Sequence, residues 1–320
     1  MTRSTAFFVN GGAGRHVCSI PALEKYEVDN PDDDFIIICE GGMDMYKGHP
    51  TLHRRAFDNW HKGLFEDKIK DRTCVSTEPY RVWEYYNQKA NLAQAFDIQV
   101  NNKGVRDLPT PNLHLWTDEI ISGRDIIDEV KEKTKKEKVI VFQPYGRSTQ
   151  PMGNKQSQLV DTGGRSFSVG DTVKLIKKLQ KKYAIVLMSE FPTDFSQFGV
   201  TEAVAQPEGA PLRIWASAIK AADGFIGCDS VGQHFAYALQ TPAVTVTGAT
   251  YPENVSYADN DIFQVLDLGA SKRRYDPIRI SFDEEVSRSH EGVMMLSDKA
   301  VDEIAKELDI VVSKGAKNGK

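Results

Sequence analysis

The segment with the clearest capacity for chemistry begins at Phe225. An apolar run that ends at Cys228 is followed directly by Asp229 and Ser230, and a helical pattern begins near Ser230. A strand that ends there would place Asp229, Ser230 and the next backbone amides at the carboxyl edge of a parallel sheet, where ligands bind. Free amides and the positive end of a helix dipole attract a phosphate, and the Ser230 hydroxyl adds a donor.

Two further residues extend this predicted phosphate site. Gly232 has no side chain, so we expect it to keep the approach to the helix open. His234, one turn into the helix, can face the same crevice and donate to a phosphoryl or sugar oxygen. The segment therefore predicts a site for a phosphorylated ligand.

A glycine-rich turn near the N-terminus is a second candidate binding element. It consists of Gly11, Gly12, Ala13 and Gly14 and follows a short apolar run. Its spacing differs from that of a dinucleotide-binding loop, so we expect no NAD and no other cofactor. The glycines can let a phosphate of an acceptor or donor approach the backbone. The four cysteines and seven histidines show no metal-ligand spacing, so no metal site is expected.

The elements that would position these residues alternate between strand and helix. Apolar runs that predict strands lie at residues 6–9, 35–39, 139–142, 184–188, 224–227 and 243–246. Helical patterns separate most of them, and a polar stretch up to residue 168 reads as a loop. This alternation predicts right-handed βαβ units and two parallel sheets. Residues 43–112 have no clear periodicity.

Length and charge narrow the class of protein. A chain of 320 residues exceeds the size at which one core usually stops growing, which favours two domains. The formal net charge of −5 provides no global positive field for nucleic acid or anionic membranes. No apolar run approaches the roughly 20 residues of a membrane helix, and the N-terminus lacks signal-peptide features. We therefore expect a cytoplasmic protein without a transmembrane segment.

The segment around Asp229 resembles the hallmark of the ADP-heptose:lipopolysaccharide heptosyltransferase family, glycosyltransferase family 9. That hallmark is D-S-G-x-x-H-x-A-x-A-L-x-x-P, followed by a strand and G-x-T-x-P. The residues in register are Asp229, Ser230, His234, Ala236, Ala238, Leu239, Pro242, Gly248, Thr250 and Pro252. The family's glycine after the serine is Val231 here, and Gly232 comes one place later.

The resemblance implies an α/β protein with the GT-B fold, in which two Rossmann-like domains with parallel sheets face each other across a cleft. We expect an N-terminal acceptor-side domain at residues 1–128 and a C-terminal nucleotide-sugar domain at residues 136–296. Residues 297–320 would form a C-terminal helix and tail that can cross back to the N-terminal domain.

The same resemblance implies which residues bind the donor. The loop and helix start that would hold the diphosphate consist of Asp229, Ser230, Val231, Gly232, Gln233 and His234. Arg165 stands where the family has a lysine and would supply a cation for the phosphates. Gln143, at the end of a predicted strand, and Glu253, after the G-x-T-x-P element, would complete the donor site.

A departure from the family concerns the catalytic base. The stretch from Gly14 to Leu23 resembles the family's G-D-x-x-x-x-x-P-A-L, but Arg15 stands at the aspartate that is thought to deprotonate the acceptor. Guanidinium cannot act as a base, so the proton would pass to His16 or Glu40. Arg15 would then hold a phosphate beside the glycine turn. A base elsewhere, substrate-assisted chemistry and loss of activity stay open.

These observations predict an inverting, metal-independent glycosyltransferase that moves a sugar from a nucleotide-sugar donor to an acceptor hydroxyl. The acceptor is a glycan or lipopolysaccharide-type molecule. One alternative is a virus-type enzyme that glycosylates a modified DNA base, for which the basic and aromatic residues 53–55, 60–62, 68–72 and 81–86 could form a local surface. Another is a catalytically inactive sugar-nucleotide-binding protein. The sequence leaves the oligomeric state open.

Overall fold

The computed structural model describes residues 4–152, 155–161, 163–193, 195–200, 204–271, 273 and 294–317, with the backbone alone for 155–158. The chain divides into two compact units, and the described part of unit 1 ends at Trp116. Unit 2 begins at Thr117 and includes the C-terminal helix.

Unit 1 contains a parallel four-stranded sheet in the order β3-β2-β1-β4. Its strands are β1 (Thr5–Asn10), β2 (Ile36–Glu40), β3 (Ala56–Asp58) and β4 (Thr73–Ser76). Its helices are α1 (Ala13–Asp29), α2 (Leu52–Arg55), α3 (Trp83–Tyr86) and α4 (Leu92–Asn101), with shorter helical segments η1 (Met43–Tyr46), η2 (Leu64–Ile69) and η3 (Pro79–Arg81). The chain passes from β1 to β2 and β3 on one side and then returns to β4 on the other. The strand order therefore reverses between β1 and β4.

Unit 2 contains a parallel five-stranded sheet in the order β11-β10-β9-β5-β8. Its strands are β5 (Val139–Gln143), β8 (Ala184–Leu187), β9 (Gly224–Cys228), β10 (Ala243–Thr247) and β11 (Phe263–Asp267), and an antiparallel pair is formed by β6 (Thr149–Met152) and β7 (Lys155–Asp161). Its helices are α5 (Thr117–Thr134), α6 (Val169–Leu179), α7 (Leu212–Ala221), α8 (Val231–Ala238), α9 (Pro252–Val255) and α10 (Asp298–Lys317), with a short segment η4 (Ser196–Phe198). Here the order reverses between β5 and β9.

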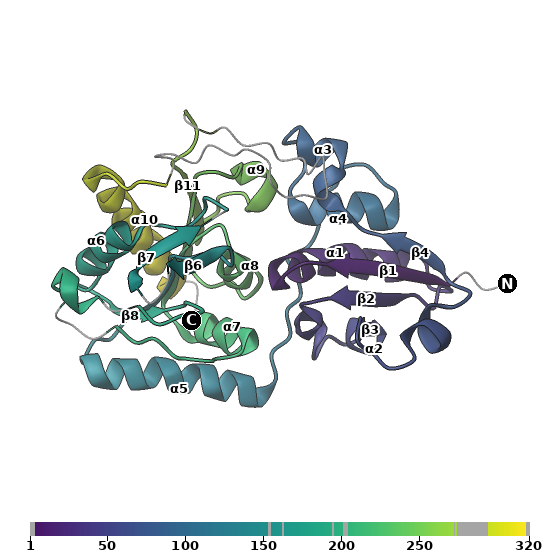
Figure 1. The fold of residues 1–320 in the computed structure, drawn as a ribbon, viewed down its shortest axis with the longest axis horizontal. Coiled ribbons are helices and arrows are strands. Elements are labelled where there is room, and N and C mark those ends of the chain that lie inside the picture. The colour runs from purple at the N-terminus through teal and green to yellow at the C-terminus, as the bar shows by residue number, and fades with distance from the viewer. Residues whose placement is uncertain are drawn as a thin grey trace. The chain divides into compact units, whose positions relative to one another are not determined.

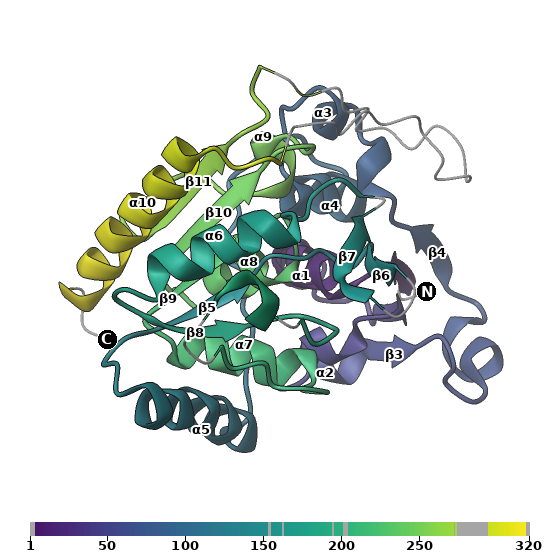
Figure 2. The ribbon, with the colours of Figure 1, turned by 60° about the vertical axis from the view of Figure 1, so that its left-hand side comes forward.

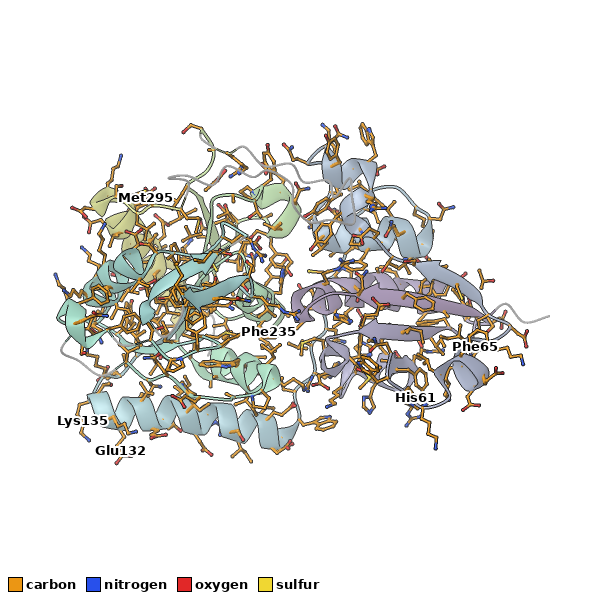
Figure 3. All side chains as sticks on the ribbon, viewed as in Figure 1. His61, Phe65, Glu132, Lys135, Phe235 and Met295 are labelled. Carbon is orange, nitrogen blue, oxygen red and sulfur yellow. The ribbon has the colours of Figure 1, made fainter. Side chains whose placement is uncertain are left out.

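Four strands of the unit 2 sheet are largely apolar on both faces, as a sheet covered by helices requires. All residues of β5, β8, β9 and β10 are buried. Helix α5 lies beside α7, and α10 packs on α6 and on β9, β10 and β11 (Figures 1 and 2). Phe235, labelled in Figure 3, is fully buried on α8. Unit 1 has its own core, which includes Phe7, Leu23, Ile37 and Phe96.

The predicted alternation and the parallel sheets are confirmed, but several details differ. The polar stretch before residue 168 is not only a loop, since it contains β6 and β7, and β11 was not predicted. The predicted boundary at residue 128 lies too late in the chain, because α5 packs on unit 2. Buried Glu119 of α5 accepts a 2.6 Å hydrogen bond from Arg213 of α7, which fixes the helix there. Over its described residues the C-terminal helix also packs on unit 2.

Candidate functional site

The candidate donor site lies at the carboxyl edge of the unit 2 sheet, where the strand order reverses. Strand β9 ends at Cys228, buried Asp229 follows, and Ser230 is the N-cap residue of α8. Strand β5, its neighbour, ends at Gln143. A crevice at such a reversal is the usual ligand position in open α/β sheets. The structure thus brings Gln143, Asp229 and Ser230 together, as the sequence predicted.

Gln143 connects the end of β5 to the start of α8, and its predicted contact with the donor stays a prediction. Its Oε1 accepts a hydrogen bond from the Gly232 amide at 2.9 Å, and its Nε2 donates to Ser230 Oγ at 3.2 Å. A Cβ on Gly232 would lie 2.5 Å from Gln143 Oε1 and 2.5 Å from the Phe225 ring. Gly232 therefore makes room for the protein's own side chains, and the expectation that it keeps the ligand's approach open stays a prediction.

Gln233 and His234 are buried on the first turn of α8. Gln233 Nε2 donates to Asp229 Oδ1 at 2.7 Å, which holds the aspartate toward the helix. His234 Nδ1 lies 2.8 Å from the hydroxyl of Tyr257, whose ring also meets the imidazole edge to face. Burial, with a smaller contribution from the Arg165 charge, lowers the pKa of His234 to about 4. At neutral pH this histidine is uncharged, so any contact that it makes with a ligand is made by a neutral imidazole.

Arg165 lies close enough to Asp229 to set the charge of the site. Its Nη1 is 3.8 Å from Asp229 Oδ2. Burial raises the pKa of Asp229, and the guanidinium of Arg165 opposes that rise. Because the arginine side chain is still partly exposed, it can turn from the carboxylate toward an incoming phosphate.

Asp161 is a residue that the sequence analysis missed. It ends β7, and its carboxylate accepts hydrogen bonds at 2.8 Å from the backbone amides of Gly163, Arg165 and Ser166 and a further bond from the Ser148 hydroxyl. Burial raises the pKa of Asp161, but these hydrogen bonds outweigh it and the net shift is downward. The carboxylate therefore fixes the loop that carries Arg165. The polar D-x-G-G-R pattern was the one signal in the sequence.

The remaining predicted donor residues lie at two places. Val231 is half-buried at the start of α8, and Glu253 is exposed on α9.

Arg273 is a second cation that was not predicted. It donates from Nε to the Gly248 carbonyl at 2.9 Å, and its guanidinium lies over the Tyr251 ring at 4.5 Å from the ring centre. The loop after β10 is thus held by an arginine from beyond β11.

In unit 1, Arg15 lies at the corresponding reversal of strand order. Its side chain is 8% exposed, its Nη2 donates to the Thr77 carbonyl at 3.4 Å, and its Nη1 is 3.7 Å from Glu78 Oε1. The guanidinium also lies 4.9 Å from the centre of the Tyr80 ring. Glu78 was not predicted as a site residue, because its proximity to Arg15 depends on the pairing of β4 with β1.

The glycine turn lies at the start of α1 and contacts the side chains of Arg15 and His16. Gly11 has a φ of +90°, and a Cβ there would lie 2.7 Å from Arg15 Cδ. Ala13 and Gly14 already belong to the helix, while Gly12 is its N-cap residue. The Gly12 carbonyl lies 3.2 Å from His16 Nδ1, so that nitrogen carries the proton. Burial lowers the pKa of His16 to about 4, although the Gly12 hydrogen bond opposes this shift.

The two predicted bases therefore have opposite surroundings. His16 is 0% exposed and packs edge to face on Tyr46. Glu40 is exposed at the end of β2, in register with Asn10 of β1. Of the two, Glu40 is the one that a solute can reach directly.

Three observations bear on the other expectations. Over the described residues, no group of three or more histidine, cysteine or acidic side chains has the arrangement of a metal site. No helix in that part of the chain is long and apolar enough to cross a membrane. Trp60 and Phe65 are 86% and 61% exposed, in the segment that also carries His61 (Figure 3). A DNA surface on that segment stays a prediction.

Solved structures resemble this chain over nearly its whole length. A family 9 glycosyltransferase from Veillonella parvula has a TM-score of 0.67 at 14% identity, covering 96% of this chain and 97% of the other. The chain has the GT-B fold. An E. coli ADP-heptose lipopolysaccharide heptosyltransferase II gives 0.60 at 12% identity, covering 98% and 99%. The E. coli heptosyltransferase WaaC with ADP gives 0.53 at 13% identity, with the same coverage.

The resemblance inferred from the motif is therefore confirmed at the level of the fold. No protein-family model matches the sequence, and no curated protein sequence matches it. At such low identity, the conclusion about the chemistry depends on the residues of the site.

Proposed function

We propose that this protein is a glycosyltransferase that moves a sugar from a nucleotide-diphosphate sugar to an acceptor hydroxyl. The observation that carries this is the carboxyl edge of the unit 2 sheet, where Ser230, the start of α8 and Arg165 converge beside buried Asp229. A helix N-terminus with an adjacent arginine and hydroxyl suits a diphosphate. The same groups would stabilise the negative charge that develops on the leaving diphosphate.

The reaction would proceed with inversion and without a metal. Inversion needs one base that removes the proton of the acceptor hydroxyl as the anomeric bond breaks. Exposed Glu40 suits this role better than fully buried His16. Arg165 and the helix dipole would take the place of a divalent cation on the phosphates.

The experiment is a screen of ADP- and UDP-sugars by thermal shift, followed by turnover of those that bind. A bound ligand raises Tm by mass action. ADP is the first probe, because the WaaC neighbour was solved with it. Binding of a nucleotide-sugar, with sugar transfer that persists in excess EDTA, is expected. Strict dependence on Mg²⁺ or Mn²⁺ would refute metal independence, and a failure to bind any nucleotide-sugar would refute the proposal itself.

A catalytically inactive sugar-nucleotide-binding protein is the second candidate. It is favoured by Arg15, whose guanidinium cannot deprotonate an acceptor and already lies beside the Glu78 carboxylate. Nucleotide-sugar binding without transfer or hydrolysis, over a panel of acceptors, would support this candidate.

The acceptor of an active enzyme would be a glycan or a lipopolysaccharide-type molecule.

A further inference from the structure

The carboxamide of Gln143 has a fixed orientation. A backbone amide can only donate, so the atom that faces the Gly232 amide at 2.9 Å must be the oxygen. The amide nitrogen therefore faces Ser230 Oγ at 3.2 Å and donates to it. The Gln143 side chain is 6% exposed, and the absence of a Cβ on Gly232 leaves the space that its oxygen occupies.

In this arrangement the Ser230 hydroxyl does not accept a capping hydrogen bond from its own helix, as the hydroxyl of an N-cap serine usually does. Ser168, the N-cap residue of α6, accepts a hydrogen bond from the Asp171 amide at 3.0 Å and so caps its own helix. Ser230 is the N-cap residue of α8, but its side chain makes no cap bond. Gln143, from the neighbouring strand, accepts from the first turn of α8 in its place.

The hydrogen bond from Gln143 also decides where the hydroxyl proton of Ser230 points. Because Ser230 Oγ accepts from Gln143 Nε2, its own hydrogen must lie away from Gln143. Ser230 is half-buried and so can still be reached by a ligand. Its hydroxyl is held ready to donate to an oxygen that arrives at the start of α8.

We infer that Gln143 is a positioning residue that presents the Ser230 hydroxyl as a donor to the phosphate oxygens of a nucleoside diphosphate. This inference rests on the proposed function, since it specifies how the same site recognises its ligand. Gln143 acts through Ser230 and through the first turn of α8, and it needs no contact with the ligand.

The test is a double-mutant cycle on ADP affinity, measured by calorimetry with Gln143→Met, Ser230→Ala and the double variant. Each single substitution should weaken ADP binding about tenfold, the usual effect of one charge-assisted hydrogen bond. The double variant should bind within about threefold of the weaker single variant, because both changes remove the same interaction. Additive losses, about a hundredfold in total, would overturn the inference.

Gln143→Glu covers the case in which Gln143→Met fails to fold. Glutamate keeps an acceptor for the Gly232 amide, so α8 stays capped, but it makes the Ser230 hydroxyl donate toward position 143 instead. Weaker ADP binding is expected, and wild-type affinity would refute the role. Asn91→Ala, which removes the N-cap of α4 in unit 1, is the control for a lost cap: it should lower Tm and leave ADP affinity unchanged.

Wild-type protein that binds neither ADP, UDP nor pyrophosphate would contradict the proposed function and this inference together. Wild-type binding with an additive cycle would contradict the inference alone.

Discussion

Replacing Asp161 with asparagine should disable the Arg165 loop without removing Arg165. The Oδ2 atom of Asp161 accepts from the Arg165 and Ser166 amides, and Oδ1 accepts from the Gly163 amide, each at 2.8 Å. An asparagine has one oxygen, so in either orientation its NH₂ group faces at least one backbone N–H. The substitution removes at least one hydrogen bond to a charged group and weakens the others, which costs the loop about 2–4 kcal/mol.

The expected consequence for the ligand is a loss of ADP affinity of about 10- to 100-fold. The reason is that Arg165 is no longer held where it can contact the phosphates, and one charge-assisted hydrogen bond is worth about 1.5–3 kcal/mol. Calorimetric titration with ADP measures this loss. Arg165→Met should show a similar loss, and the combined variant should be little worse than Arg165→Met alone.

The control is Asp34→Asn, which changes a carboxylate of unit 1 that pairs with Arg55 and Arg72 near the surface. It should leave ADP affinity unchanged. Because the pKa of Asp161 lies below its ordinary value, its contribution is fully present above that value and is lost only as pH falls through the lowered pKa. The affinity comparison therefore holds across pH 6 to 8. Wild-type ADP affinity in Asp161→Asn would refute the reasoning.

Three other predictions concern stability and the base. His16 and His234 have pKa values of about 4 in the folded protein against 6.5 when unperturbed, so the unfolded chain binds more protons between these values. The free energy of unfolding should therefore fall by about 3 kcal/mol per histidine from pH 7 to 4. Urea midpoints that stay level down to pH 5 would contradict this. Gly232→Ala should lower the stability of unit 2 by about 1–3 kcal/mol, as measured by calorimetry, because the new Cβ overpacks against Gln143. Gly170→Ala is the control and should leave the stability unchanged, because its Cβ would meet only Ser168 Oγ at 3.8 Å. If Glu40 is the base, Glu40→Gln should lower kcat at least about 100-fold with little change in KM. The variants Glu78→Gln, His16→Ala and Arg15→Asp should lower kcat less. A faster Arg15→Asp together with an unimpaired Glu40→Gln would show that this chain has lost its base.

Much of the fold could be predicted because six strands of the two sheets, β1, β2, β5, β8, β9 and β10, contain short apolar runs. Residues 139–142 and 184–188 are apolar on both faces, which is the pattern of a covered parallel sheet. The paired strands β6 and β7 could not be predicted in this way, since Gln150, Lys155 and Gln156 give no apolar alternation. Residues 43–112 resisted prediction because most of their segments are very short and carry no periodic signal, the ten-residue α4 being the exception.

The candidate site was predictable where it is local in sequence. Asp229, Ser230 and His234 lie within one strand-to-helix turn, so their spacing alone places them together. The bonds of Gln143 to Ser230 and Gly232, and the approach of Arg15 to Glu78, depend on which strands are neighbours in each sheet. That information is not contained in the local spacing of residue types.

The reversal of strand order in each sheet also sets when the two candidate site edges can form during folding. In unit 1, the sequence interval that β1 must close to pair with β2, as in Ala6 with Ile36, is shorter than the interval to β4, as in Thr5 with Thr73. In unit 2, the interval from β5 to β8, as in Val139 with Ala184, is likewise shorter than the interval from β5 to β9, as in Ile140 with Gly224. Loop closure over longer intervals is slower and comes later in synthesis. A ribosome-bound chain that ends after β8 would thus hold a partial sheet without the edge at which we propose that phosphate binds. A ligand of that edge could assist folding only after α8 has emerged.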